Sequence, residues 1–262
     1  MYNIGFLGLG KMGSAILEGI LKQNLYKKED IAFYAPSDKT KAKGKGCGII
    51  LEQNERSLLL SSSIIVLAIK PQKYDELLSL VKDEDFSNRI IISLAPGKSI
   101  SYLSSIFNGA SIVRAMPNTP ATINKATTTL ASLKDINKEV LDIFSSVGSY
   151  VILKESQIDE AIPLQGSMPA YLLTFAKAFI NEGVKHGLSY EEAKSLVLNS
   201  IIGSSLLALN SEESLDTLIN NVCSKGGSTI EGLNKLIDNN FIEAINECYE
   251  ACVKRSKELA NA

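Results

Sequence analysis

Short apolar runs and segments of helical periodicity alternate along the first part of the chain. Seven runs rich in β-branched residues are typical of strands, at residues 3–7, 31–34, 63–69, 89–94, 111–114, 127–131 and 149–153. Helical patterns lie between them, beginning near residue 11 and after Pro36 and covering residues 74–81 and 137–146. Runs such as 64–69 are continuously apolar, as buried parallel strands are. This alternation predicts βαβ units and a doubly wound, mostly parallel α/β sheet.

The pattern changes after residue 157. From Ile158 to the end we find no strand pattern, and apolar residues recur at helical spacing, as at Leu172, Phe175 and Phe179. We therefore predict two domains, an α/β domain over residues 1–157 and an all-helical domain over residues 158–262. The segment 196–209 is apolar on several faces, more than one thin layer of helices covers. It either packs on the first domain or forms a subunit interface, and the second interpretation is favoured.

Composition and charge exclude several classes of partner. A chain of 262 residues with 45% apolar content is long enough to bury two cores. It carries 27 Lys and Arg residues against 29 Asp and Glu residues, without a basic stripe, so no nucleic acid partner is expected. The apolar runs are far shorter than the roughly 18 to 20 residues that cross a bilayer, so no membrane span is expected. The N-terminus has no secretory signal pattern, and we expect a cytoplasmic protein.

Cysteine and histidine usage gives no sign of a metal centre. Cys47, Cys223, Cys248 and Cys252 form no CxxC pair, and His186 is the single histidine of the chain. Neither a disulfide framework nor a zinc site is indicated. Cys248 and Cys252 are spaced to share a helix face and to chelate a soft metal, but burial as small apolar side chains is the favoured interpretation. We expect no bound metal.

A glycine motif follows the first predicted strand and opens the first predicted helix, with the sequence Gly8-Leu9-Gly10-Lys11-Met12-Gly13. In such a motif Gly8 makes the tight turn, Gly10 lets the backbone approach a pyrophosphate, and Gly13 lets helix and strand pack closely. The phosphates then lie at the helix N-terminus, where unpaired N–H groups and the helix dipole favour negative charge. These six residues therefore predict a dinucleotide site in a Rossmann-like fold.

The end of the second predicted strand bears on which dinucleotide binds. An NAD site usually has Asp or Glu there, which binds the ribose 2′-OH and repels a 2′-phosphate. This chain has Tyr34-Ala35-Pro36-Ser37, with Asp38 only afterwards. Ser37 is placed to donate to a 2′-phosphate, with Lys39 or Lys41 supplying charge, or else it merely caps the next helix. We predict NADPH as cofactor, with NADH weaker.

A rigid turn follows the strand at 111–114, with the sequence Met116-Pro117-Asn118-Thr119-Pro120. Two prolines around Asn-Thr force extended backbone at the carboxyl edge of the sheet, where such folds bind ligands. The glycine motif, Lys70-Pro71-Gln72 and Gly226-Gly227-Ser228-Thr229-Ile230 accompany this turn in order and spacing. Together these strings resemble the pyrroline-5-carboxylate reductase family over essentially the whole chain.

The resemblance implies roles for individual residues. Lys70-Pro71 and the turn Met116–Asn118 lie against the nicotinamide end of the cofactor in that family, and Asn54 lies near the adenosine ribose. The segment Gly226–Ser228 opens a helix whose N–H groups bind the substrate carboxylate, and Thr229 bonds the ring nitrogen. The helical domain pairs two subunits, which implies a homodimer, or a higher oligomer of dimers, whose active sites are completed at the dimer interface.

The implied reaction is the NADPH-dependent reduction of 1-pyrroline-5-carboxylate, a small cyclic imino acid, to L-proline. Reducing a C=N bond needs a hydride on carbon and a proton on nitrogen, and the cofactor carries the difficult part. Imines protonate more readily than ketones, so a chain with one histidine and no metal cluster suffices.

Four departures from the family pattern bear on the substrate: Gln165, Met168, Lys225 and the segment Asn124-Lys125-Ala126. Met168 either projects toward the substrate or fills a gap in the core. Asn tolerates left-handed backbone at that segment, whereas Ala does not. Two alternatives stay open, a reductase of another cyclic imino acid and a catalytically weak, dinucleotide-binding regulatory paralogue.

Overall fold

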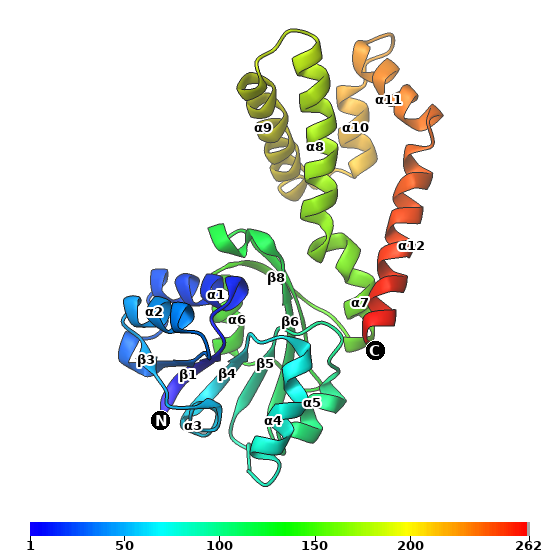
Figure 1. Cartoon of the computed structure of the whole chain (residues 1–262). Helices are drawn as coiled ribbons and strands as arrows, with labels where there is room; N and C mark the ends of the chain where they lie inside the picture. Colours follow the sequence, from blue (N-terminus) through cyan, green and yellow to red (C-terminus); the bar gives the residue numbers. More distant parts are fainter. Residues whose placement is uncertain (261–262) are drawn as a thin grey trace. The chain divides into compact units, whose positions relative to one another are not determined.

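The computed structural model describes residues 1–260 and contains two compact units. The first unit is Met1–Pro169 together with the chain from Cys252 onward, and the second is Ala170–Ala251 (Figure 1). The units therefore divide later than the expected boundary at residue 157, and the end of the chain returns to the first unit. The segment after residue 157 belongs to the first unit because Ile158, Ala161 and Pro163 are buried there.

An eight-stranded sheet forms the centre of the first unit, with the order β3-β2-β1-β4-β5-β6-β7-β8. The strands are β1 (Tyr2–Leu7), β2 (Ile31–Tyr34), β3 (Ile50–Leu51), β4 (Ser62–Leu67), β5 (Ile90–Ser93), β6 (Ser111–Pro117), β7 (Ala126–Ala131) and β8 (Gly148–Ile152). All neighbouring pairs are parallel except β6 and β7. The first six strands follow the 3-2-1-4-5-6 order of the Rossmann fold, which confirms the predicted fold class.

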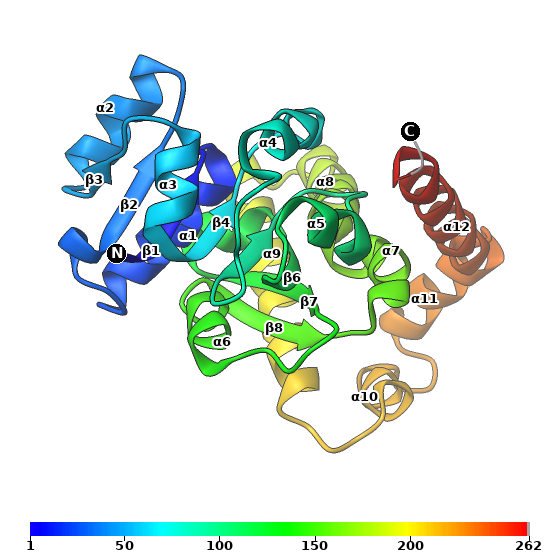
Figure 2. The same ribbon diagram turned by 90° about the horizontal axis from the view of Figure 1, so that it is seen from below.

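Helices cover both faces of this sheet (Figure 2). They are α1 (Lys11–Lys22), α2 (Asp38–Gly46), α3 (Glu55–Ser61), α4 (Tyr74–Val81), α5 (Ile100–Ile106), α6 (Lys138–Ser145) and α7 (Ile158–Ala161). Successive residues of β4 point to opposite faces, so that Val66 packs with α1 and α6, and Leu67 packs with α3, α4 and α5. Burial on both faces explains why this strand reads as a continuous apolar run.

Three short elements were not predicted from the sequence, namely β3, α3 and α5. They have two, seven and seven residues, which is too short for a hydrophobic period to stand out. The strand expected at 111–114 also continues to Pro117, because Met116 and Pro117 pair with Thr129 and Thr128 of the antiparallel neighbour β7.

The second unit is helical throughout. It consists of α9 (Tyr190–Leu209), α10 (Leu215–Val222) and α11 (Ser228–Asp238) with most of α8 (Met168–Lys185) and of α12 (Phe241–Ala260). Large apolar side chains remain exposed along α9, among them Leu196, Ile202, Leu206 and Leu207. Such a broad exposed apolar surface is typical of a protein interaction face.

Candidate functional site

The glycine motif forms the loop between β1 and α1. Gly8 has a φ of +91°, and a Cβ there would lie 2.7 Å from the carbonyl oxygen of Ala68. A Cβ on Gly13 would lie 2.7 Å from the carbonyl oxygen of Gly8 and 2.9 Å from the Cβ of Ala68. At Gly10, by contrast, no heavy atom of the described chain beyond the two adjoining residues lies within 4 Å of the Cβ position. Gly8 and Gly13 are thus required by the fold itself, whereas Gly10 borders open space.

The N-terminus of α1 has the features of an anion-binding site. Gly10 is the N-cap, no side chain of the described residues caps the helix, and its first turn contains no acidic residue. Lys11, the first helical residue, is exposed, whereas Met12 packs against Ala121 and other small buried residues. Uncapped N–H groups and the helix dipole attract negative charge. These residues therefore fit the pyrophosphate of a dinucleotide.

The other residues predicted to bind the cofactor follow the carboxyl ends of neighbouring strands. Ser37 follows β2, Asn54 follows β3, the pair Lys70-Pro71 follows β4, and Met116–Asn118 ends β6. Strands β1 to β6 are parallel, so all these ends lie at one edge of the sheet, where open α/β sheets bind ligands. The fold thus brings these segments to the edge that carries the glycine loop.

A cleft of about 140 Å³ opens beside Gly8 at this edge. Its apolar lining consists of Leu7, Tyr34, Pro36, Ile69, Leu77 and Leu80. Glu55, Lys73 and Glu76 also border it, and the Lys73 ammonium lies 2.6 Å from the Glu76 carboxylate. The apolar lining suits a planar aromatic group. Sequence reasoning missed Ile69, Leu77 and Leu80; the position of Ile69 just after β4 was a usable signal, whereas Leu77 and Leu80 belong to α4.

Ser37 and Asn54 both cap helices. The Ser37 hydroxyl accepts a hydrogen bond of 3.3 Å from the N–H of Thr40 at the start of α2, and Asn54 Oδ1 accepts one of 2.8 Å from the N–H of Ser57 at the start of α3. The capping alternative for Ser37 is therefore present in the structure. The Ser37 hydroxyl also lies 2.7 Å from Thr40 Oγ1, where either oxygen can be the donor. When Thr40 donates, the Ser37 proton is free for a phosphate, so capping and a contact with a phosphate are compatible.

The lysines near Ser37 differ in their pairing. Lys41 lies 3.7 Å from the Asp38 carboxylate, and Lys43 pairs with Glu18 at 3.3 Å. Lys39 is exposed at the start of α2. The side chain of Asp38 is fully in solvent, and Glu55 borders the cleft that Tyr34 and Pro36 line.

Tyr74 holds the segment that follows β4. It comes directly after the single turn Pro71–Lys73, is fully buried, and has its hydroxyl 2.9 Å from Ser93 Oγ at the end of β5. Burial raises the pKa of Tyr74 well above its ordinary value, so this hydroxyl stays protonated. Sequence reasoning missed this residue, because its partner belongs to another strand.

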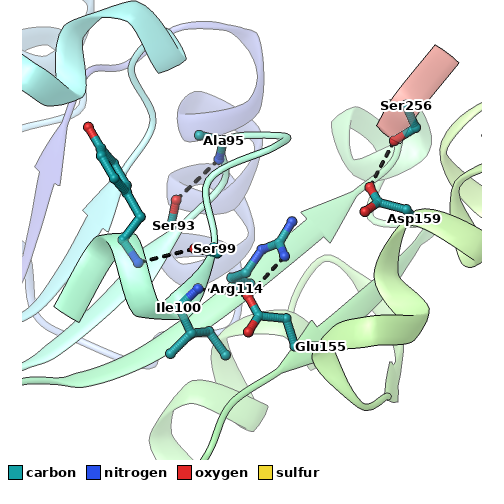
Figure 3. A network of polar contacts seen from close by, with 9 residues as sticks. Ser93, Ala95, Ser99, Ile100, Arg114, Glu155, Asp159 and Ser256 are labelled. Carbon is teal, nitrogen blue, oxygen red and sulfur yellow. Dashed lines mark hydrogen bonds and ion pairs between the residues drawn. The ribbon is translucent and has the colours of Figure 1, made fainter. Parts of the chain in front are cut away.

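A polar network joins the end of β6 to the chain that enters the C-terminal helices (Figure 3). Glu155 Oε1 accepts one hydrogen bond from Arg114 Nη1 at 3.0 Å and one from the N–H of Ile100 at 2.7 Å. The Arg114 side chain is 6% exposed and the Glu155 side chain 27%. Nearby, Ser256 near the end of α12 donates to Asp159 of α7 at 2.8 Å. Arg114 and Glu155 are far apart in the sequence, which offered no sign of this pair.

Gln165 and Met168 lie in different surroundings. Gln165 belongs to the π-helical segment Ile162–Gly166 and is buried; its Nε2 lies 3.5 Å from Thr129 Oγ1, and its Oε1 has no partner among the described residues. Met168 begins α8 and is 38% exposed. That exposure is more than a residue filling a core gap would show.

The segment Asn124–Ala126 accommodates its departure from the family pattern. Asn124 has a φ of +57°, in the left-handed region that Asn tolerates. Ala126 is the first residue of β7, where no left-handed backbone is needed. This departure is therefore compatible with the fold.

The predicted substrate residues of the second unit lie at the N-terminus of α11. Gly226 has a φ of +72°, Gly227 is the N-cap, and α11 begins at Ser228. No side chain of the described residues caps this helix. Thr229 is exposed at the second helical position, so the alternative in which it caps α11 does not hold. Lys225 is exposed in the preceding loop.

The structure therefore divides the predicted site residues into two groups. The cofactor residues and Met168 belong to the first unit, and Gly226–Thr229 belong to the second. Among the residues that the structure describes, no cluster of metal-ligating side chains occurs and no helix is long and apolar enough to span a membrane.

Comparison with known proteins gives matches over nearly the whole chain. A family model described as pyrroline-5-carboxylate reductase dimerisation matches residues 155–259, and one described as NADP oxidoreductase, coenzyme F420-dependent, matches residues 3–97. The chain is 33% identical to the pyrroline-5-carboxylate reductase of Methanosarcina acetivorans, with 98% of this chain and 97% of the relative covered.

Solved structures agree with these matches. The pyrroline carboxylate reductase of Plasmodium falciparum with NADP bound superposes with a TM-score of 0.86 at 34% identity, covering 99% of this chain and 98% of that one. The pyrroline-5-carboxylate reductase of Coxiella burnetii gives a TM-score of 0.87 at 30% identity, with 98% of each chain covered.

Proposed function

The chain belongs to the pyrroline-5-carboxylate reductase family, and from this premise we propose that it reduces 1-pyrroline-5-carboxylate to L-proline with NADPH. The observation that carries the proposal is the 33% identity to a reductase of this name over 98% of the chain. The glycine loop adds physical support, because Gly10 leaves space beside an uncapped helix N-terminus.

Residues of the first unit would hold the cofactor. The uncapped N–H groups at the start of α1 bind the pyrophosphate, with Lys11 adding positive charge. The segments Lys70-Pro71 and Met116–Asn118 line the nicotinamide end at the carboxyl edge of the sheet. When bound, NADPH supplies the hydride for the imine carbon.

We propose NADPH rather than NADH as the preferred cofactor. The strand β2 ends in Tyr34 and not in an acid that would repel a 2′-phosphate, and the Asp38 side chain is in solvent beyond the cap of α2. Ser37 has a hydroxyl proton to donate, and the exposed Lys39 supplies charge. A relative of the same family has been solved with NADP bound, which supports this choice.

Residues of the second unit would hold the substrate. The N–H groups of Gly227 and Ser228 at the uncapped start of α11 bind the carboxylate, as a helix N-terminus favours an anion. The Thr229 hydroxyl donates to the ring nitrogen and holds it for protonation. This chain needs no buried acid for the step, because an imine nitrogen is itself basic.

We propose that the working form is a homodimer, or a higher oligomer built from dimers, with active sites completed at the dimer interface. The match to a dimerisation family model over residues 155–259 supports this assembly. The exposed apolar side chains of α9 supply the surface that such an interface would bury. We place the enzyme in the cytoplasm, where its four free cysteines stay reduced.

A second substrate has a specific observation in its favour. Met168 is partly exposed at the start of α8, and Gln165 is buried next to it. A larger residue at such a site reshapes the pocket, so another cyclic imino acid, such as one with a six-membered ring, is the second candidate.

A steady-state assay with NADPH separates the possibilities. We expect turnover of 1-pyrroline-5-carboxylate with a kcat/KM above that for a six-membered cyclic imino acid. The reverse order would favour the second substrate. Tight NADPH binding without turnover of either compound would indicate a regulatory paralogue.

A further inference from the structure

Asn118, at the end of the Met-Pro-Asn turn, has both polar atoms of its side chain occupied within the protein. Its Oδ1 accepts a hydrogen bond of 2.9 Å from the N–H of Thr127, and its Nδ2 donates one of 3.0 Å to the carbonyl oxygen of Gln165. The residue is only 8% exposed. A side chain with this burial and these bonds has little left to offer a ligand, although its sequence motif suggested a direct cofactor contact.

The Gln165 carbonyl can accept a hydrogen bond from Asn118 because the residue four positions later is proline. In an α-helix this carbonyl would accept from the N–H of residue 169, but residue 169 is proline and has no N–H. The chain adopts π-helical geometry over Ile162–Gly166 immediately before α8. The α-helical donor to this carbonyl is therefore absent, and the Asn118 amide supplies a hydrogen bond to it.

The two bonds join three segments of the first unit. Asn118 terminates β6, Thr127 is the second residue of β7, and Gln165 precedes Met168, the residue assigned to the substrate side. The Thr127 bond continues the ladder between β6 and β7, where Pro117 pairs with Thr128. The Gln165 bond then links this ladder to the segment that enters α8.

We propose that Asn118 is a positioning residue, which fixes the nicotinamide-facing turn Met116–Asn118 relative to the segment Gln165–Pro169 that carries Met168. The inference rests on the proposed function, since it assigns the cofactor to the turn and the substrate to the Met168 segment. Hydride transfer depends steeply on the distance between donor and acceptor, and a displacement of about 1 Å costs on the order of 10²-fold in rate. The Asn118 side chain acts through this distance, and not by a hydrogen bond of its own to either ligand.

The two hydrogen bonds of the Asn118 side chain, to the Thr127 N–H and to the Gln165 carbonyl, form a bridge between their segments. Asn118→Asp tests this bridge because it breaks the bond to Gln165 and keeps the bond from Thr127. The carboxylate still accepts from the Thr127 N–H, but its second oxygen faces the Gln165 carbonyl and repels it. The protonated carboxylic acid instead donates to that carbonyl and restores the bridge. Burial and the facing carbonyl raise the pKa of the introduced acid, so the repaired form gains population as the pH falls. Neither group that contacts the side chain, the Thr127 N–H or the Gln165 carbonyl, titrates.

Initial rates and NADPH binding are measured for wild type and Asn118→Asp between pH 5.5 and pH 8. At pH 8 we expect kcat to fall on the order of 10²-fold. The Kd for NADPH should change by less than about threefold, which is well below the change expected from losing one charge-assisted hydrogen bond to the cofactor. As the pH falls, the ratio of variant to wild-type kcat should rise. A Kd that rises in step with the loss of kcat would instead make Asn118 a cofactor ligand. An unchanged kcat, or a loss that is equal at every pH, also overturns the proposal.

Asn137→Asp is the matched control. Asn137 caps α6 on the surface through a bond of 3.1 Å from the N–H of Val140, and its Nδ2 donates at 3.3 Å to the Glu139 carboxylate. Asp caps a helix equally well, and its repulsion from Glu139 is screened by solvent because both side chains are exposed. The chemical change and the added charge are the same, and the kcat ratio should not depend on pH.

Pro169→Ala gives an independent test that leaves Asn118 in place and introduces a helix former. The new N–H at residue 169 allows the segment before α8 to change from π-helical to α-helical geometry, which moves the Gln165 carbonyl relative to Asn118, so kcat should fall several-fold without a change in NADPH affinity. A wild-type kcat in this variant would overturn the proposal even if Asn118→Asp did not fold.

Wild-type turnover of 1-pyrroline-5-carboxylate is measured first, so that a failure of the proposed reaction is distinguished from a failure of the role proposed for Asn118. The bridge is then still tested by thermal denaturation. The acid of Asn118→Asp has a higher pKa in the folded protein than in the unfolded chain, so its Tm relative to Asn137→Asp should rise from pH 8 to pH 5.5. A constant difference in Tm would refute the bridge.

Discussion

Gly10→Ala is expected to abolish tight NADPH binding while leaving the fold intact, whereas Gly13→Ala is expected to damage both. Gly10 has a φ of −67°, which alanine adopts freely, and no heavy atom of the described chain beyond the two adjoining residues lies within 4 Å of its Cβ position. Alanine is a poorer N-cap than glycine, so the fold should lose less than about 1 kcal/mol. The added methyl group occupies the space through which the backbone approaches the pyrophosphate.

The expected loss of affinity follows from the contacts at stake. A phosphate held by helix N–H groups makes charge-assisted hydrogen bonds of about 1.5–3 kcal/mol each. Losing one of them raises the Kd for NADPH about ten- to a hundredfold. Fluorescence titration of the cofactor measures this change, and circular dichroism measures the Tm.

Gly13→Ala provides the contrast. Its Cβ would lie 2.7 Å from a backbone oxygen and 2.9 Å from the Cβ of Ala68, so α1 must move away from the sheet. Overpacking of this kind costs about 1–3 kcal/mol, which lowers the Tm of a domain of this size by roughly 2–12 °C. The reasoning fails if Gly10→Ala binds NADPH with the wild-type Kd, or if its Tm falls as far as that of Gly13→Ala.

Three further outcomes are expected. Thr229→Ala should lower kcat/KM for the imine by about 10²-fold or less with NADPH affinity unchanged, and Thr229→Ser should keep most of the activity. If Thr229→Ala instead lowers the Tm and leaves the kinetics normal, Thr229 does not belong to the substrate site. The kcat/KM with NADPH should exceed that with NADH by about tenfold or more, which corresponds to one charge-assisted hydrogen bond to the 2′-phosphate. Lys39→Ala should reduce this ratio. A preference for NADH would contradict the assignment of the 2′-phosphate site to the end of β2. Sedimentation of the full chain at micromolar concentration should show at least a dimer, because α9 exposes so many large apolar side chains, and a stable monomer would refute this.

The sequence alone was sufficient where the physics is local. The turn at Gly8, the glycine spacing of the loop and the strands of the doubly wound sheet follow from backbone freedom and from hydrophobic period, and each depends on residues adjacent in the chain. The same holds for Asn124, whose left-handed backbone its residue type tolerates. The helical character of the C-terminal part also followed from its period.

Only the tertiary structure decided which distant residues meet. Asn118 belongs to a recognisable motif, but its partners Thr127 and Gln165 lie nine and 47 residues further along the chain. Arg114 and Glu155 are likewise 41 residues apart. Hydrogen bonds of this kind depend on the order and direction of strands, and on a carbonyl whose α-helical donor is absent at Pro169. A pattern read along the chain records which groups are available, whereas the distances between them exist only after the sheet and its helices have packed.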